Sequence, residues 1–328
     1  MGTIKKKEYS YIEKYSTKTK YKEDNYYYCG DAFANAVGLP GPLMCSINMF
    51  LGHSNTAKTN ALILSAVDAI KKGHLPVFII TEKKWNWEHA VQLGLQATKN
   101  EDGAWEGSFI YNDGFDYVEQ ITDFINEILD EQEKGNIPQS LLFLWDSVGT
   151  IPCKMTFDGK GGKQHTASVL SDKIGMGLHS RITNSKKDSY PYTNTLVVVN
   201  QPWVELPDNP FGQPTIKAKG GNALWTAATL VFLFGNQKNS GVSFIPATKS
   251  GRKIIFATRT KISVLKNHIT GLAFQDGKII ATPHNFINDT KEALEQYKKE
   301  YSQYWNGILS GTGEIVLGEA EESIEMDE

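Results

Sequence analysis

The chain has 328 residues, of which 40% are hydrophobic and 22% are charged, and its formal net charge is −3 at pH 7. These values are ordinary for a soluble globular protein, and the length suffices for one large α/β domain with appendages or for two small domains. No apolar run approaches the length of a membrane span, so the sequence predicts no transmembrane helix.

Residues 1–7 lead into tyrosine and lysine and not into the apolar centre of a signal peptide. Cys29, Cys45 and Cys153 are widely spaced and odd in number, so a disulfide framework is not expected. Both observations predict a reducing, cytoplasmic compartment.

The small net charge conceals a strong asymmetry between the two ends. Residues 1–22 carry seven lysines against two glutamates, whereas residues 311–328 carry seven acidic residues and no basic one. Two interpretations stay open: both ends are solvated tails, or the acidic tail competes with a polyanion for a basic surface elsewhere on the protein.

The most informative motif lies at residues 52–59, between the apolar run 45–51, which predicts a buried strand, and residues 60–72, which predict a helix. A strand, a loop of small residues, Lys-Thr and a helix make up a phosphate-binding P-loop. Backbone N–H groups and the helix dipole favour an anion there. The residues expected to contact the nucleotide are Gly52, His53, Ser54, Asn55, Thr56, Ala57, Lys58, Thr59 and Asn60.

Two side chains of the loop have distinct expected roles. Lys58 would reach the β- and γ-phosphates, and the Thr59 hydroxyl would ligate Mg²⁺. The residue before the lysine is normally glycine and here is Ala57, which is tolerable only where the backbone conformation is open to a residue with a Cβ.

Four further apolar runs, at residues 76–81, 140–145, 195–200 and 229–234, predict buried strands. Between them, residues 117–132 place apolar side chains at helical spacing. Short apolar strands that alternate with helices indicate a parallel sheet covered on both faces. Ligands of such folds bind beyond the carboxyl ends of the strands.

Polar residues follow three of these strands. Asp146 has the position of the usual Mg²⁺ partner after a P-loop. Glu82 could orient and deprotonate the attacking water. Gln201 could sense the γ-phosphate and pass its loss to the following loop. The catalytic residues predicted on this basis are Lys58, Glu82 and Gln201, and the metal ligands are Thr59 and Asp146.

Two long segments, at residues 149–166 and 202–219, are expected to be irregular. Basic residues interleaved with aromatics and glycine suit a phosphate backbone and unstacked bases, although a mobile surface loop is the alternative. The candidate DNA contacts are Lys154, Lys160 and Lys163 in the first segment, and Trp203, Phe211, Lys217 and Lys219 in the second.

Taken together, residues 29–286 resemble the RecA family of recombinases, most closely its bacterial and phage branch. Glu82 lies 24 residues beyond Lys58 and is followed by His89-Ala90 and Gly94 at family-like spacings. Residues 144–148 resemble the family's Walker B strand. Asn200-Gln201 resembles the start of its second DNA loop, which ends on a run like Gly220-Gly221-Asn222, and residues 261–269 resemble a segment that reaches the neighbouring subunit's ATP.

The resemblance implies an α/β RecA-like P-loop NTPase core at residues 29–286, with a mostly parallel sheet flanked by helices. It also implies an N-terminal oligomerisation segment at residues 1–28, a C-terminal helix at 287–310 and an acidic disordered tail at 311–328. Asn86 and His89 would contact the base of ATP. Lys266 would act catalytically on the ATP of a neighbouring subunit, with His268 beside it in place of the family's second lysine. Gly220, Gly221 and Asn222 would contact DNA.

The implied function is an ATP- and Mg²⁺-dependent DNA recombinase that forms helical filaments on single-stranded DNA and exchanges strands with duplex DNA in recombination and repair. Single-strand-binding and mediator proteins are further expected partners, and a bacterial or phage-infected cytoplasm is the expected location. Two alternatives stay open. One is a RecA-fold ring helicase, and the other is a turnover-deficient DNA-binding paralogue, which Ala57 and His268 favour.

Overall fold

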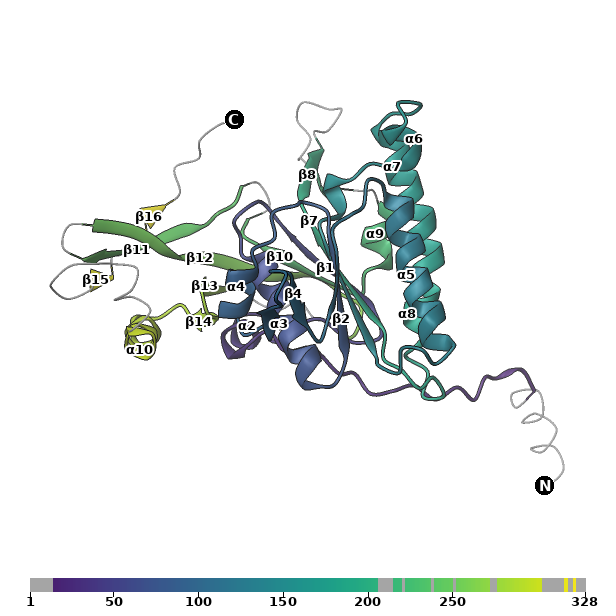
Figure 1. Cartoon of the computed structure of the whole chain (residues 1–328), viewed down its shortest axis with the longest axis horizontal. Coiled ribbons are helices and arrows are strands. Elements are labelled where there is room, and N and C mark those ends of the chain that lie inside the picture. Colours follow the sequence, from purple (N-terminus) through teal and green to yellow (C-terminus); the bar gives the residue numbers. More distant parts are fainter. Residues whose placement is uncertain are drawn as a thin grey trace, which may run out of the picture.

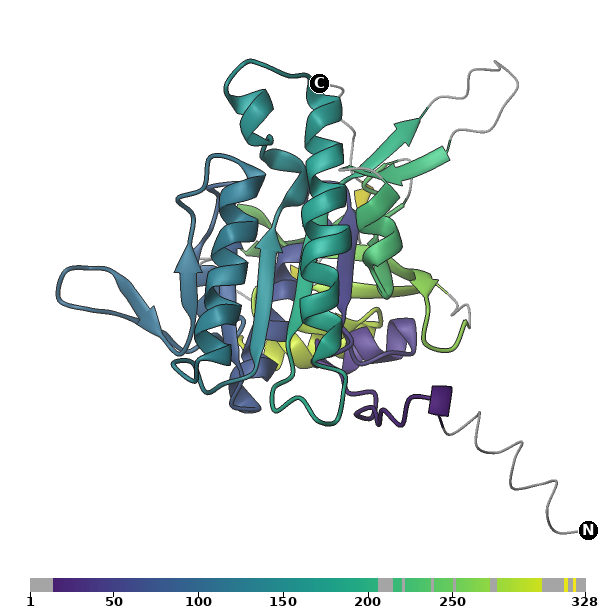
Figure 2. The same ribbon diagram turned by 90° about the vertical axis from the view of Figure 1, so that its right-hand side faces the viewer.

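The computed structural model describes residues 14–205, 215–219, 222–236, 239–249, 252–271, 276–302, 316–317 and 321–322. Its centre is a mostly parallel sheet with helices on both faces (Figures 1 and 2). From one edge to the other the main strands are β14 (Phe286–Asn288), β13 (Gly277–Ala281), β12 (Arg252–Asn267), β10 (Leu230–Phe234), β1 (Ile47–Gly52), β7 (Thr195–Asn200), β6 (Leu141–Asp146), β2 (Leu75–Ile80) and β5 (Ile110–Asn112).

The strands from β10 to β5 pair in parallel, and every residue of β1, β6, β7 and β10 is buried. The five strands predicted from apolar runs are therefore confirmed to within two residues at each end. Uninterrupted apolar runs are required here because both faces of these strands face helices.

Two core clusters, one on each face of the sheet, result from the alternation of side chains along the strands. Phe50 packs with α3 (Lys58–Lys71), α2 (Asp31–Val37) and α4 (Trp87–Gln92) on one face. Met49 packs on the other face with α5 (Val118–Glu133) and with the continuous helical stretch α7 (Lys163–Leu170), η2 (Ser171–Leu178) and α8 (His179–Asn184).

The two segments expected to be irregular contain regular structure, and that prediction was wrong for most of their described residues. The first contains η1 (Val148–Thr150), α6 (Lys154–Phe157) and the start of α7. The second contains β8 (Pro202–Glu205), which pairs with β9 (Thr215–Ala218) in a separate two-stranded hairpin. The sequence gives little sign of these elements, since α6 has four residues and no buried one, and the two hairpin strands pair only with each other.

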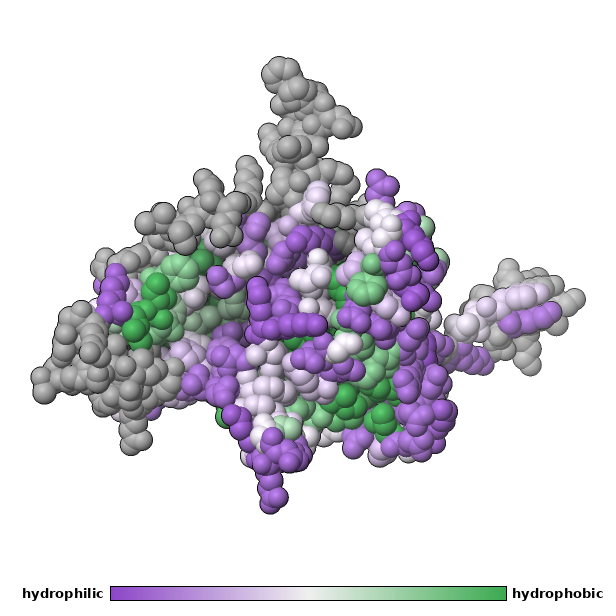
Figure 3. All heavy atoms as spheres, turned by 45° about the horizontal axis from the view of Figure 1, so that its top comes forward, coloured by the Kyte–Doolittle hydropathy of each residue, from purple (hydrophilic) through white to green (hydrophobic). Residues whose placement is uncertain are grey.

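Strands β11 (Ser243–Lys249) and β12 form an arm that extends beyond the central sheet (Figure 1). Hydrophobic side chains gather over this arm (Figure 3), and Ile255 on β12 is 58% exposed. Helix α10 (Lys291–Glu300) packs on the arm through Tyr297, whose ring stacks on Phe256 with centroids 6.2 Å apart.

The structure corrects the expected C-terminal elements. Residues 287–288 belong to β14, and the helix begins only at Lys291, because the Thr290 side chain caps it by accepting a hydrogen bond from the Ala293 N–H. In the expected acidic tail, β15 (Val316–Leu317) and β16 (Glu321–Glu322) pair with β11. These four residues therefore depart from the expectation of disorder, since the outer edge of β11 offers backbone hydrogen-bonding groups.

The described part of the N-terminal segment is fastened to the end of the sheet opposite the P-loop. The Lys22 ammonium donates to the carbonyls of Ser185 (2.9 Å) and Tyr192 (2.6 Å), and Tyr21 forms a bridge with Lys187. Of the helices in the described ranges, none is long and apolar enough to cross a membrane.

Candidate functional site

The strand register brings the predicted polar residues to one edge of the sheet. Ile80 pairs with Asp146, and Leu51 pairs with Asn200, so the chain segments that follow β1, β2, β6 and β7 begin at a common level. Residues separated by more than 100 positions in the sequence therefore line one site at the carboxyl ends of parallel strands.

The loop between β1 and α3 folds tightly around Lys58. The Lys58 ammonium donates to the His53 carbonyl oxygen at 2.5 Å and lies 3.4 Å from the Thr56 hydroxyl. A Cβ at Gly52 would collide with the Phe234 carbonyl oxygen and the Thr56 side chain, so this position requires glycine. Helix α3 has no side-chain cap at its N-terminus, which leaves its first-turn N–H groups for an anion.

Ala57 occupies the position where the sequence departs from the usual P-loop. Its backbone lies in the left-handed region, with φ 70° and ψ 22°. That region costs a residue with a Cβ roughly 1–2 kcal/mol relative to glycine. The loop therefore adopts the conformation that glycine favours, in spite of the alanine.

The acidic residues lie directly beside the start of α3. The Thr59 hydroxyl donates to Asp146 Oδ2 at 2.7 Å, and the Ser147 hydroxyl donates to Glu82 Oε1 at 2.7 Å. The Thr81 hydroxyl bonds both backbone groups of Ser147 and so fixes the turn after β6. Sequence reasoning did not assign a role to Ser147, because only the fold reveals which carboxylate its hydroxyl reaches.

A cavity of about 210 Å³ separates these groups, and its lining includes Thr59, Glu82 and Asp146. Trp85 also lines it, as does Lys84, which was not predicted from the sequence. The cavity is large enough for several water molecules. It thus provides space for a cation and a reacting oxygen between the two carboxylates.

Burial perturbs both charged groups at the base of the site. It lowers the pKa of Lys58 to about 8, although Asp146 and Glu82 act in the opposite direction. It raises the pKa of Asp146 to about 6, with Glu82 adding to the shift and the Thr59 hydrogen bond opposing it. Ionised forms of both side chains are therefore costly in the free protein, and a bound cation and anion would compensate them.

A metal ion at this site would need ligands from outside the protein. The described residues contain no group of three or more His, Cys, Asp or Glu side chains suited to a metal. Thr59 and Asp146 offer two oxygen ligands, which fits Mg²⁺, an ion that commonly keeps waters and phosphate oxygens in its coordination shell.

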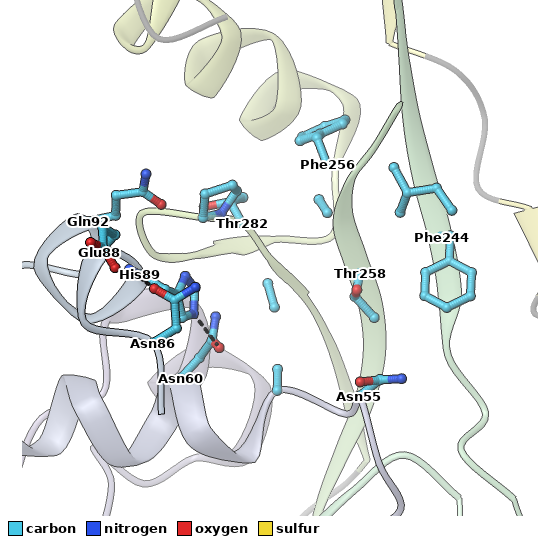
Figure 4. A pocket seen from close by; sticks show the side chains of 15 residues that line it. Asn55, Asn60, Asn86, Glu88, His89, Gln92, Phe244, Phe256, Thr258 and Thr282 are labelled. Carbon is cyan, nitrogen blue, oxygen red and sulfur yellow. Dashed lines mark hydrogen bonds between the residues drawn. The ribbon is translucent and has the colours of Figure 1, made fainter. Parts of the chain in front are cut away.

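A second, larger pocket of about 560 Å³ opens between the P-loop, α4 and the β11–β12 arm (Figure 4). On one side, His89 Nε2 lies 3.1 Å from Asn60 Oδ1, and the Asn86 side chain accepts from the His89 N–H. Burial lowers the pKa of His89, so its imidazole is neutral at pH 7. The predicted residues Asn55, Ala57, Asn60, Asn86 and His89 all line this pocket.

The opposite wall of the larger pocket was not predicted. It is formed by β11 and β12, with Phe244 and Thr258 labelled in Figure 4, and Thr282, after β13, lines the pocket next to Gln92. These residues lie about 190 or more positions beyond the P-loop and carry no recognisable motif. Amides, a neutral imidazole and apolar walls suit a flat heteroaromatic ring.

Gln201 is tied to the β8–β9 hairpin. Asn200 accepts from the Gln201 N–H (2.8 Å) and donates to the Lys219 carbonyl (2.7 Å). The Lys219 ammonium in turn donates to Gln201 Oε1 at 2.7 Å. These hydrogen bonds among three residues therefore couple the position of the Gln201 side chain to that of Lys219.

The candidate DNA-binding elements α6 and β8–β9 project from the same end of the molecule (Figure 2). Lys154 and Lys160 are exposed, and Trp203 is 53% exposed. Lys154 lies over the Tyr117 ring, with its ammonium 4.8 Å from the centroid. Lys163, Lys217 and Asn222 belong to described elements, but their side chains lie outside the description, as do Phe211, Gly220 and Gly221 altogether.

Lys266 and His268 do not join this cluster within the chain. Lys266 pairs with Val231 on β10, and Val231 pairs with Met49 on β1. Met49 lies three residues, or about 10 Å, before the end of β1 that leads into the P-loop. Its ammonium donates to the carbonyls of Trp225 (2.6 Å) and Thr226 (3.0 Å) near the end of α9 (Asn222–Ala227), and His268 is exposed.

No protein-family model matches the chain, and no curated protein matches it in sequence.

Substitution Ala57→Gly should increase the free energy of unfolding by about 1 kcal/mol, because glycine removes the steric cost of the left-handed conformation. Urea denaturation of the nucleotide-free protein measures the change. As a control, Ala293→Gly in α10 removes the same methyl group from a helix and should reduce stability by about 1 kcal/mol. A loss of stability in both variants would contradict the strained conformation of Ala57.

Substitution Asp146→Asn should stabilise the protein at neutral pH in the absence of nucleotide and Mg²⁺. The folded-state pKa of about 6 exceeds the value near 4 of an unfolded aspartate, so stability falls as pH rises through 6. The gain should be on the order of 2 kcal/mol at pH 7 and should vanish near pH 4.

Urea denaturation across this pH range tests the prediction. Asp123→Asn, which removes an exposed carboxylate from α5, is the control and should show no such pH-dependent gain. Parallel stability curves for wild type and Asp146→Asn would show that burial of Asp146 is not costly.

Proposed function

We propose that this protein is a DNA-dependent ATPase that assembles on single-stranded DNA and promotes homologous strand exchange. The observation that carries the ATPase part is the arrangement around the small cavity: Thr59 bonded to Asp146, Glu82 held by Ser147, and an uncapped helix beside them. The recombinase part rests on the RecA-like motifs, and with it come the expected cytoplasmic location and the role in DNA repair.

In the proposed reaction, Lys58 and the first-turn N–H groups of α3 bind the β- and γ-phosphates. Thr59 and Asp146 would hold Mg²⁺, which neutralises charge that develops on the phosphoryl oxygens. Glu82 orients the attacking water and takes its proton. Ser147 positions Glu82, since its hydroxyl contacts the carboxylate and not the reacting atoms.

The larger pocket suits the base of the nucleotide. Asn60, Asn86 and His89 offer hydrogen-bonding groups on one side, and the arm supplies apolar surface opposite them. The base of ATP would therefore lie between α4 and β12.

Coupling to DNA would run through Gln201. A DNA phosphate that attracts the Lys219 ammonium competes with Gln201 Oε1 for it. Gln201 would then be released toward the γ-phosphate, so DNA binding and ATP hydrolysis would favour each other.

Assembly would require a rearrangement of the Lys266 side chain, in addition to the release of Gln201. Lys266 and His268 lie away from their own P-loop, and a role in hydrolysis therefore requires the ATP of a neighbouring subunit. To reach it, the Lys266 ammonium has to leave the carbonyls of Trp225 and Thr226. A head-to-tail contact of this kind propagates as a helical filament or closes into a ring.

A turnover-deficient DNA-binding protein is the second candidate, because Ala57 is held in a strained conformation and His268 replaces a lysine. ATP hydrolysis measured with and without single-stranded DNA separates it from the ATPase. Electron microscopy of the same samples distinguishes filaments from the rings of a helicase. DNA-stimulated turnover with filaments is the expected result.

Substitution Glu82→Gln should lower ATP turnover by roughly 10²-fold or more while ATP still binds, because the amide keeps size and hydrogen bonding but cannot accept the proton. Ser147→Ala should lower turnover by roughly tenfold, since Glu82 loses the group that orients it. Steady-state kinetics and nucleotide binding measure both effects. Ser180→Ala on α8 removes a remote hydroxyl as a control, and wild-type turnover in Glu82→Gln would refute the assigned base.

Substitution Lys219→Ala should weaken single-stranded DNA binding and reduce the slope of log affinity against log salt by about 0.7. A salt series of binding measurements gives the slope. Lys134→Ala, at the end of α5 away from the β8–β9 hairpin, is the control and should leave the slope unchanged. Equal slopes for wild type and Lys219→Ala would remove Lys219 from the DNA contacts.

A further inference from the structure

A cleft beside a protruding hairpin plays no part in the proposed ATPase. The hairpin consists of β3 (Ala97–Lys99) and β4 (Trp105–Gly107) and projects on the left of Figure 2. The cleft has a volume of about 690 Å³, and four aromatic side chains contribute to its lining: Trp87, Trp105, Phe109 and Tyr111.

The aromatic walls form one connected array. Trp87 and Trp105 are stacked, with centroids 5.7 Å apart and planes 18° apart, and Tyr111 lies 4.9 Å from Trp87. A Cβ at Gly107 would collide with the Phe109 ring, so the hairpin packs closely on this array. All four rings are only partly buried, so a part of each is accessible to a ligand.

The surroundings of the cleft are acidic. Residues 97–107 contain Glu101, Asp102 and Glu106 against one lysine, Lys99, and Glu106 lines the cleft. Such a rim repels the phosphates of a nucleic acid, in contrast to the lysine-bearing loops beyond β6 and β7.

The hairpin itself shows how a cation is accommodated on these rings. The Lys99 ammonium lies 4.9 Å from the centroid of the Trp105 ring and 3.4 Å from a carboxylate oxygen of Glu88. An aromatic face together with a carboxylate is therefore already used within the chain to hold a positive charge.

We propose that this cleft binds an arginine-bearing segment of a partner protein. A guanidinium group stacks on indole faces and pairs with a carboxylate, and tryptophan, tyrosine and arginine are enriched at protein interfaces. The guanidinium would take the place of the Lys99 ammonium on the Trp105 ring, the partly exposed parts of the other rings would add aromatic contact, and Glu106 would supply the charge. The proposal is independent of the ATPase function.

The α4 helix separates the cleft from the larger pocket. Trp87 lines the cleft, whereas Asn86, Glu88 and His89 line the pocket. Partner binding at Trp87 therefore occurs one residue from groups that face the proposed nucleotide base.

The test is calorimetric titration of the full-length protein with a short peptide that carries two arginines. A peptide with citrulline at both positions is the matched control, since citrulline keeps the shape of arginine but has no charge. The arginine peptide should bind at least tenfold more tightly. Equal binding of the two peptides would overturn the proposal.

Variants assign the binding to the cleft and not to the acidic C-terminal residues. Trp105→Leu should lower the affinity for the arginine peptide by roughly tenfold, and Glu106→Gln should lower it by about threefold. Glu101→Gln makes the same charge change in the turn of the hairpin, outside the cleft lining, and should bind as wild type. Unchanged affinity in a folded Trp105→Leu protein, as checked by circular dichroism, would also overturn the proposal.

Discussion

The site depends on the burial of two opposite charges, Lys58 and Asp146, at the carboxyl edge of one parallel sheet. Each ionised group is costly there, as the pKa values of about 8 and 6 indicate. Both groups lie where the register of β1, β6 and β7 brings the carboxyl ends of these strands to a common level. A phosphate with its metal ion would satisfy both groups, so the instability of the free site favours ligand binding.

The strained backbone of Ala57 is a second energetic cost at the same site. This backbone is left-handed, a conformation that glycine would adopt at lower cost. The strained backbone of Ala57 and the buried charges of Lys58 and Asp146 both lower the stability of the free protein. All three residues lie beside the proposed phosphate site. This concentration is typical of functional sites, where stability is given up for a defined arrangement.

The strand directions also divide the molecule into two ends. The P-loop, α6 and the β8–β9 hairpin lie at the carboxyl end of the sheet (Figure 2), and the described N-terminal residues are fastened to the other end. Lys266 is level with the middle of β1. Because the Lys266 ammonium is held by carbonyls of α9 and not at its own P-loop, its proposed part in hydrolysis would need the ATP of a neighbouring chain. Self-assembly is therefore part of the proposed function and not an addition to it.

The sequence by itself determined the five parallel strands, the helices 60–72 and 117–132, and the residues that follow each strand, because buried strands require uninterrupted apolar runs and ligands bind at their carboxyl ends. Only the tertiary structure decided that Ser147 holds Glu82, that Phe244 and Thr282 line one pocket with His89, and that Lys266 caps α9. These contacts join positions far apart in the chain through side chains without a local pattern. The short helix α6 and the β8–β9 hairpin were missed for a related reason, since such small elements leave almost no periodicity to detect.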